Sequence, residues 1–486
     1  KYACNSQKKI PLSENIVLIF FIDIMKLITG SMLRYRELEN DMFINTKDTW
    51  APLNNWPYLG YADIKNGINL DSKNYGRSIS IYEKGMKHEL KRKIHELLSL
   101  TSKIKQSKSV HVSLSNSCLS SGGLSKNIVM KFYKKGINFD WASETLIESS
   151  MVDNLKSQID SQLNMFKPYI NEIADTVRLP FSASIYHAII RNHISATLEK
   201  IRVGKKVSGD ALILSSGNEL TNRLLSSAAI QNKIHVINIA HGESFGVQDN
   251  PLFSMGERLF GNAILGYGNN FVTRYDEVAY KIPNQNKNKY ISGTSNLIKR
   301  IYNNKKNIKR DIKGNIFYFP TRLRGNNYRY GPYQDCPDYL YLSWQKSLIE
   351  IFKKKLIIKA HPKETNSNLF NVIHESYITD NLIHLIDQVD VFIFDFIGTG
   401  FSYAAATDKP IIFFDIGIQK FTPSAYDAIS KRAITINISN HTNLSYENIL
   451  DMAKVHKPEY TFTELFCLSN DGKTREDKLV EYLVDL

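Results

Sequence analysis

The chain has 486 residues, of which 43% are hydrophobic and 23% are charged. This is an ordinary globular composition, and the length is too great for one core, so we expect roughly two or three domains. The formal charge of +14 points to an anionic partner: nucleic acid, an anionic membrane surface or a phosphorylated substrate. The four cysteines lie far apart and lack zinc-ligand spacing, which argues against a disulfide framework and favours a reducing compartment.

The most apolar run near the start of the chain is Ile16–Ile22. It is interrupted by Asp23 and Lys26, well short of the roughly 20 residues that a membrane span needs. We therefore expect any membrane contact to be peripheral. Residues 1–200 carry no pattern that we can tie to a function, and Ser113–Ser125, rich in Ser and Gly, is predicted to be a loop.

A β-α-β unit begins after Asp210. Its predicted elements are a strand over Ala211–Leu214, a helix over Glu219–Gln231 and a strand over His235–Ala240. The second strand ends at His241-Gly242-Glu243, the carboxyl end at which such sheets place catalytic groups. His241 and Glu243 are therefore candidates for the base that takes a proton from a hydroxyl. The alternative of a His that ends a strand and a solvated Glu stays open.

A basic segment, Asn296–Lys313, follows two further strand ends at Gly266–Gly268 and Tyr290–Thr294. Such a run predicts a solvated linker at a domain boundary, or a basic docking surface. The predicted organisation is an N-terminal domain over residues 1–295, a linker over 296–313 and a C-terminal domain over 314–486.

The second half repeats the alternation of strands and helices. Strands are predicted at Ile316–Phe319, Leu356–Ala360 and Val389–Phe394, and a helix at Trp344–Lys354. Polar residues follow each strand: Arg322 and Arg324 after the first, His361 and Lys363 after the second, and Thr399 and Ser402 after the third. Because the carboxyl ends of parallel strands meet at one edge, we expect these groups to converge on phosphate oxygens.

The third of these strands leads into a glycine-containing loop, Asp395–Ser402. Gly398 and Gly400 allow the backbone to approach a ligand, and the N–H groups that open a helix predicted at Phe401–Thr407 would face an anion. Asp395 could orient a loop N–H. A strand at Ile411–Phe414 is predicted to follow. The alternative, that Gly-Thr-Gly is only a tight turn, stays open.

The order of these segments resembles a known family. His241-Gly242 at a strand end, a later SGTS strand end, the basic segment, and then FPTRLRG, KAHPKE and DFIGTGFSYAAATDKPIIFFD resemble the GT-B glycosyltransferases of bacterial surface polysaccharides. Among these are the CDP-glycerol glycerophosphotransferases and the sialyl- and Kdo-transferases of capsule and lipopolysaccharide. The resemblance covers about residues 210–415. In those families the loop serines are adjacent, whereas here Gly400 and Phe401 separate Thr399 from Ser402.

The resemblance implies an α/β protein with two Rossmann-like domains facing across a cleft. His361 would contact donor phosphate, Thr399 and Ser402 would lie in the phosphate loop, and His241 would act as base from the other domain. The implied reaction moves a Kdo- or sialic-type sugar from a CMP-linked donor onto a glycan or lipid-linked glycan. A CDP-glycerol-type or UDP-sugar transferase and a UDP-GlcNAc epimerase are the alternatives within the fold.

The same basic residues and backbone donors bear on the need for a metal ion, on the partners and on the location of the protein. Arg, Lys, His and backbone donors can carry the charge of the leaving phosphate, so we expect no metal and no other cofactor. A non-catalytic polyanion-binding protein is the alternative from another class; nucleic acid is the weaker form of it, because no base-stacking motif accompanies the basic run. The expected location is the cytoplasm, with contact at the inner face of the membrane left open.

Overall fold

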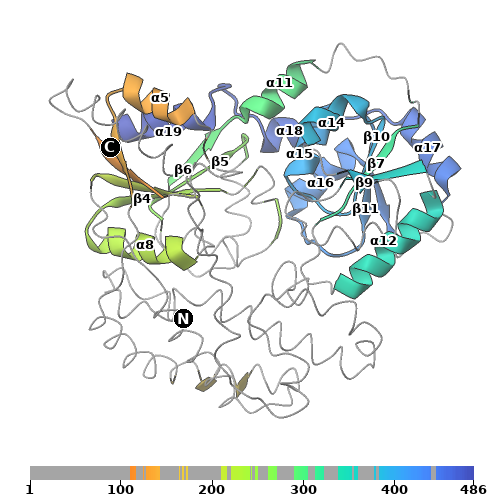
Figure 1. The fold of residues 1–486 in the computed structure, drawn as a ribbon, viewed down its shortest axis with the longest axis horizontal. Coiled ribbons are helices and arrows are strands. Elements are labelled where there is room, and N and C mark those ends of the chain that lie inside the picture. Colours follow the sequence, from red (N-terminus) through yellow and green to blue (C-terminus); the bar gives the residue numbers. More distant parts are fainter. Residues whose placement is uncertain are drawn as a thin grey trace.

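The computed structural model describes residues 110–115, 124, 127–142, 164, 167–168, 171–172, 209–215, 220–240, 242, 247–249, 261–270, 289–304, 312, 314–321, 338–352, 355–359, 377–378, 382–438 and 445–486. Within these residues the chain forms two six-stranded parallel sheets flanked by helices (Figure 1). The predicted α/β class with two Rossmann-like units is confirmed. None of the described helices has the length and apolar character needed to cross a bilayer.

The first sheet has the strand order β2-β1-β3-β4-β5-β6, and every pair is parallel. Its strands are β1 (His111–Leu114), β2 (Asn138–Trp141), β3 (Ala211–Leu214), β4 (His235–Ile239), β5 (Ala263–Tyr267) and β6 (Lys289–Gly293). Most of them are short apolar runs, as expected for a sheet buried on both faces. Helices α5 (Asn127–Lys134) and α19 (Arg475–Val484) contribute to the core on one face, and α8 (Leu220–Gln231) covers the other.

The prediction of a loop over Ser113–Ser125 is wrong at its start, because Ser113 and Leu114 belong to β1. Ser113 is buried, and its hydroxyl donates a hydrogen bond of 2.7 Å to Asp140 in β2. A serine is tolerated inside this strand because the neighbouring strand supplies an acceptor for it.

The second sheet has the order β9-β8-β7-β10-β11-β12. Its strands are β7 (Ile316–Phe319), β8 (Leu356–Lys359), β9 (Tyr377–Ile378), β10 (Val391–Phe394), β11 (Ile411–Asp415) and β12 (Ile434–Asn437). The chain runs outward from β7 to β9 and then returns to the other side of β7 at β10. This is the Rossmann order, and the reversal between β7 and β10 is the point at which such sheets bind ligands.

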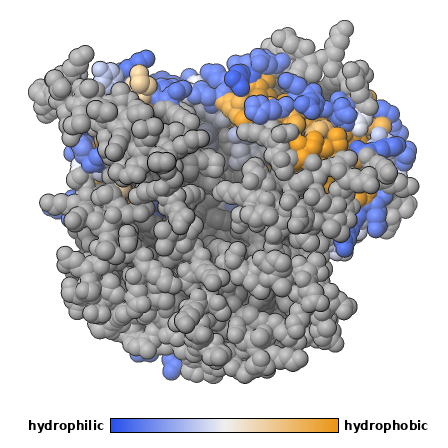
Figure 2. Space-filling view, viewed as in Figure 1, coloured by the Kyte–Doolittle hydropathy of each residue, from blue (hydrophilic) through white to orange (hydrophobic). Residues whose placement is uncertain are grey.

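Helices cover both faces of the second sheet. One face carries α12 (Asp338–Phe352) and α17 (Tyr446–Val455), and the other carries α15 (Thr399–Ala405), α16 (Pro423–Arg432) and α18 (Thr461–Phe466). The short helix α14 (Leu382–Leu385) packs into the same hydrophobic core as α15, α16 and α18. Figure 2 shows apolar surface near α11, α14 and α15 among hydrophilic side chains.

The chain passes between the two units twice. Helix α11 (Asn296–Asn304) leads from β6 toward the second unit, so the first part of the predicted linker is helical. Its Ile298 is fully buried in the core that α15, α16 and α18 form in the second unit, whereas Lys299 and Arg300 are exposed. After α18 the chain returns, and α19 packs beside α5 on the first sheet (Figure 1). The last helix therefore packs on the first sheet, although it follows the second unit in the chain.

Two glycines allow the returning segment to lie directly on the strand ends. A Cβ atom at Gly268 would lie 2.3 Å from the backbone of Phe466, and one at Gly293 would lie 2.5 Å from the backbone of Arg475. Neither distance is possible for a real side chain. Glycine at both positions is therefore required for the return of the chain to the first sheet.

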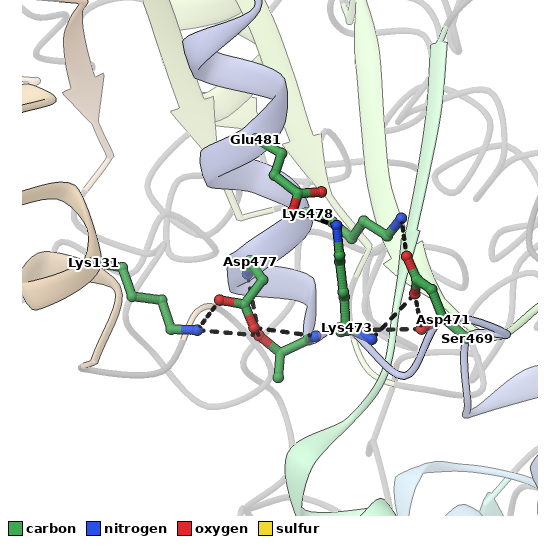
Figure 3. Close-up of polar contacts among 8 residues, drawn as sticks. Lys131, Ser469, Asp471, Lys473, Asp477, Lys478 and Glu481 are labelled. Carbon is green, nitrogen blue, oxygen red and sulfur yellow. Dashed lines mark hydrogen bonds and ion pairs between the residues drawn. The ribbon is translucent and has the colours of Figure 1, made fainter. Parts of the chain in front are cut away.

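Ion pairs fasten the start of α19 (Figure 3). Lys131 of α5 pairs with Asp477, Lys478 pairs with Asp471, and Lys473 pairs with Glu481 at 2.5 Å. The hydrogen bond from Lys478 lowers the pKa of Asp471 to about 2, so this carboxylate is charged at neutral pH. These side chains are partly exposed to solvent, and each pair contributes little to stability by itself.

Candidate functional site

The candidate site lies at the carboxyl ends of β7 and β10. Phe319 at the end of β7 is the register partner of Phe394 at the end of β10, so Thr321 and the loop after Asp395 emerge side by side. Of the predicted site residues, the structure describes Gly398, Thr399, Gly400 and Ser402, all after β10. The predicted residues Arg322, Arg324, His361, Lys363, His241 and Glu243 lie outside the described residues.

Helix α15 begins inside the glycine loop. It starts at Thr399, two residues before the predicted start, with Gly398 as its N-cap residue in extended conformation. The N–H groups of Phe401 and Ser402 donate to the Gly398 carbonyl at 3.0 and 3.3 Å. The Phe401 ring packs between Phe394 and Phe462, with ring centroids 5.5 and 5.0 Å away. These contacts hold the half-exposed Gly398, Thr399 and Gly400 at the sheet edge.

Gln419 fixes the loop before α15, and sequence reasoning missed it. Its side chain accepts a hydrogen bond of 2.6 Å from the Ile397 N–H and donates one of 3.1 Å to the Ile397 carbonyl. Gln419 is buried and follows β11, the strand beside β10. The amide therefore substitutes for a backbone partner and immobilises the turn. The only signal in the sequence is its position after the neighbouring strand.

Ser402 is fully buried one turn into α15. Its hydroxyl has no hydrogen-bond partner among the residues that the structure describes. A buried hydroxyl left without a partner costs on the order of 1–3 kcal/mol. A ligand or a further part of the chain that supplied a partner would recover this free energy.

The loop after β4 touches the start of α15. Gly242 has a backbone φ of +77°, and a Cβ atom there would lie 2.7 Å from Thr399 Oγ1. The His-Gly segment of the first sheet and the Gly-Thr-Gly segment of the second are therefore in direct contact. Gly242 lies between the predicted base candidates His241 and Glu243 in the sequence.

A strap from the first unit, defined here as residues 247–249, secures this contact. Asp249 donates its N–H to the Lys420 carbonyl at 2.7 Å, and Thr422 donates its N–H to the Val247 carbonyl at 3.1 Å. The Val247 side chain is fully buried in the core of the second unit. The strap therefore ties the loop after β4 to the segment that follows Gln419.

Arg475, the first residue of α19, supports the same loop from the other side. The guanidinium is buried, donates to the Ala240 carbonyl at 3.3 Å and lies 3.9 Å from the ring centroid of Tyr267. Ala240 immediately precedes His241. The returning C-terminal helix therefore holds the end of β4 in place, a role with no signal in the local sequence.

Substitution of Gly242 tests the contact with Thr399. In Gly242→Ala the new methyl group would displace Thr399, and the transfer activity that the sequence predicts should fall about ten- to a hundredfold, the range for a misplacement of about 1 Å. The positive φ alone should cost about 1–2 kcal/mol of stability, because a Cβ atom is strained in this conformation. Steady-state kinetics and thermal unfolding measure the two effects.

Gly417→Ala is the matched control. Gly417 has the same φ of +77°, but a Cβ atom at this position would have no neighbouring atom within 4 Å, so the substitution tests backbone strain without the contact. We expect a similar loss of stability and little loss of activity. Equal kinetics in the two variants would show that the approach of Gly242 to Thr399 has no role in the reaction.

Comparisons with known proteins give weak similarities. No family model and no curated protein sequence matches the chain. Among solved structures, a UDP co-structure of S. aureus MnaA has a TM-score of 0.36 at 10% identity, covering 78% of this chain and 97% of that one. A Listeria monocytogenes protein assigned as a UDP-N-acetylglucosamine 2-epimerase has a TM-score of 0.39 at 12% identity, with coverages of 81% and 92%. The glycotransferase of kitacinnamycin has a TM-score of 0.38 at 11% identity, with coverages of 77% and 99%. Similarity at this level determines neither the family nor the function of the chain.

Proposed function

We propose that the protein is a metal-independent glycosyltransferase of the GT-B type that uses a nucleotide-activated sugar. The observation that carries this proposal is the contact between Gly242 and Thr399. It joins a loop at the carboxyl end of the first parallel sheet to the glycine loop at the switch point of the second. Two Rossmann-like units that meet in this way provide one edge for a nucleotide donor and a second edge for an acceptor.

The donor side of the proposed site is the second unit. Gly398, Thr399 and Gly400 are half-exposed at the start of α15, where backbone N–H groups can meet a phosphate. The buried hydroxyl of Ser402 would gain a partner if ligand binding rearranged this turn. In the proposal, Arg322, Arg324, His361 and Lys363 supply the remaining positive charge around the leaving phosphate.

The proposed reaction is a displacement at the anomeric carbon. His241 or Glu243 takes the proton of the acceptor hydroxyl while its oxygen forms a bond to that carbon. The bond between the anomeric carbon and the phosphate oxygen breaks, and its electron pair leaves with the nucleotide. The resulting negative charge is met by protein groups that are already positioned, so the proposal needs no divalent ion.

The proposal also names the sugar donor, the acceptor and the location of the protein. The sequence motifs favour a CMP-linked Kdo- or sialic-type donor and a glycan or lipid-linked glycan acceptor at a bacterial surface. A cytoplasmic location, with contact at an anionic membrane surface, would suit a lipid-linked acceptor. Exposed Lys299 and Arg300 on α11 supply local positive charge for such a contact.

A donor panel tests the function and the metal independence together. Purified protein is incubated with CMP-, CDP- and UDP-linked donors, and nucleotide release is followed with and without EDTA. We expect release from one donor class at a rate that EDTA does not change, because Arg, Lys and His can balance the leaving phosphate.

The possible results separate the alternatives. Loss of activity in EDTA that Mg²⁺ or Mn²⁺ restores would contradict the metal-independent phosphate site. Conversion of UDP-GlcNAc to an epimer without transfer would identify an epimerase. Failure to bind or cleave any of these donors would remove the enzymatic proposal and leave a polyanion-binding protein.

A further inference from the structure

A buried carboxylate lies at the switch point, directly after β10. Asp395 is 1% exposed and accepts hydrogen bonds from three aromatic side chains. The donors are the Tyr318 hydroxyl, the Tyr341 hydroxyl at 3.0 Å and the Trp344 indole N–H at 3.0 Å. Burial of a carboxylate is costly unless hydrogen bonds replace its water, and here β7 and α12 provide them.

The Tyr341 hydroxyl has further partners among the described residues, and one of them is the Tyr318 hydroxyl at 3.5 Å. The Tyr341 hydroxyl also accepts a hydrogen bond of 2.9 Å from the N–H of Thr321, which is itself buried. Tyr341 therefore donates to Asp395 and accepts from Thr321 with one oxygen atom. Thr321 immediately precedes the segment that carries Arg322 and Arg324. The network thus connects the beginning of the glycine loop to the beginning of the arginine segment.

The direction of the hydrogen bond from Tyr318 to Asp395 is fixed. Burial and the neighbouring Asp395 raise the pKa of Tyr318 well above its usual value, so this phenol remains a donor at any pH at which an enzyme works. Ile397 lies two residues after Asp395, and the Gln419 side chain forms hydrogen bonds with both of its backbone groups. The first part of the glycine loop is therefore fixed at Asp395 and at Ile397, before α15 begins.

We propose that Asp395 is a positioning residue, which acts through Tyr341 to hold Thr321 after the end of β7 in register with the glycine loop. This inference rests on the proposed function, because it assigns the two segments to the same donor phosphates. The network does not touch the phosphates. It holds Thr321 beside the glycine loop, and in the proposal this spacing sets the affinity for the nucleotide part of the donor.

Two buried tyrosines provide a matched pair of variants. Tyr318→Phe and Tyr341→Phe each remove one phenol that donates to Asp395, and both side chains are fully buried. Only Tyr341→Phe also removes the acceptor of the Thr321 N–H. A purely structural role of the network predicts equal nucleotide affinity in the two variants, whereas a positioning role predicts weaker nucleotide binding in Tyr341→Phe only.

The experiment compares nucleotide affinity, thermal stability and amide exchange in both variants and in the wild type. CMP, CDP and UDP are titrated by calorimetry. We expect Tyr318→Phe to lose about 2–4 °C in Tm, the size for one lost hydrogen bond, and Tyr341→Phe to lose more, because the Thr321 N–H also loses its acceptor. Only Tyr341→Phe should bind the preferred nucleotide about fivefold more weakly and show faster hydrogen exchange in peptides that contain Thr321.

The results are distinguishable from those that test the proposed function. If the wild type binds a nucleotide and both variants bind it equally well, the positioning inference is overturned and the proposed function stands. If the wild type binds none of the three, the proposed function fails. Exchange at Thr321 then decides the network alone: faster exchange in Tyr341→Phe only would support the anchoring, and equal exchange in both variants would overturn it.

Discussion

His361→Ala should leave the protein folded and lower the rate of sugar transfer by roughly two to three orders of magnitude, the range for loss of one preorganised charge-stabilising group. His361 follows β8, which lies beside β7 in the second sheet. The carboxyl end of β8 is at the same edge as Thr321 and the glycine loop. A cation or hydrogen-bond donor in this position would meet the charge that develops on the leaving phosphate.

His384→Ala is the control for this substitution. His384 is exposed on α14 in the same unit and is not one of the proposed site residues. It should retain full activity, and both variants should unfold at temperatures close to that of the wild type. Near-normal turnover in a folded His361→Ala protein would exclude His361 from the mechanism.

The buried strands were predictable from the sequence because both of their faces are covered. β3 and β7 have the predicted bounds, and β11 extends one residue beyond its predicted end. Each is a continuous apolar run flanked by turn residues, the pattern of a strand that is buried on both faces of a parallel sheet. β1 was missed because its Ser113 depends on Asp140, a partner 27 residues away in the chain.

Helix starts were predicted less well, for local reasons. α12 begins at Asp338 rather than at Trp344, because its first turns contain a Tyr-Leu-Tyr-Leu run whose residues do not follow a helical period. The predicted start of α15 is two residues late because Gly400, a residue type with low helix propensity, lies in its first turn. In both cases tertiary packing decided the conformation.

The candidate site was predictable only up to the edge of each sheet. The rule for strand ends places Gly242 and Thr399 at two carboxyl edges, but nothing local indicates that these edges meet. Their contact depends on Val247, which is buried in the other unit, and on the return of α19 to the first sheet. Gln419 was missed for the same reason, because its partner Ile397 lies 22 residues away.

The second large effect concerns the base. One of the substitutions His241→Ala and Glu243→Gln should lower transfer by about 10²- to 10⁴-fold, the contribution of a positioned general base. Nucleotide affinity should change little, because both residues belong to the first unit and the donor phosphates are assigned to the second. A group within hydrogen-bond reach of the acceptor hydroxyl is needed only when the acceptor attacks. Gly242 lies between the two residues in the sequence and approaches Thr399 at the start of α15, so the first unit reaches the glycine loop at this point.

Glu350→Gln is the control for a neutralised carboxylate, because Glu350 is exposed on α12 in the second unit. It should transfer sugar at the wild-type rate. Calorimetric titration of CMP, CDP and UDP, run beside the transfer assay, separates binding from chemistry. Two outcomes contradict the assignment: weaker nucleotide binding in the inactive variant would place that residue in the donor site, and full activity of both His241→Ala and Glu243→Gln would place the base elsewhere in the chain. Loss of transfer with unchanged nucleotide affinity is the expected result, because the base acts on the acceptor hydroxyl and not on the nucleotide.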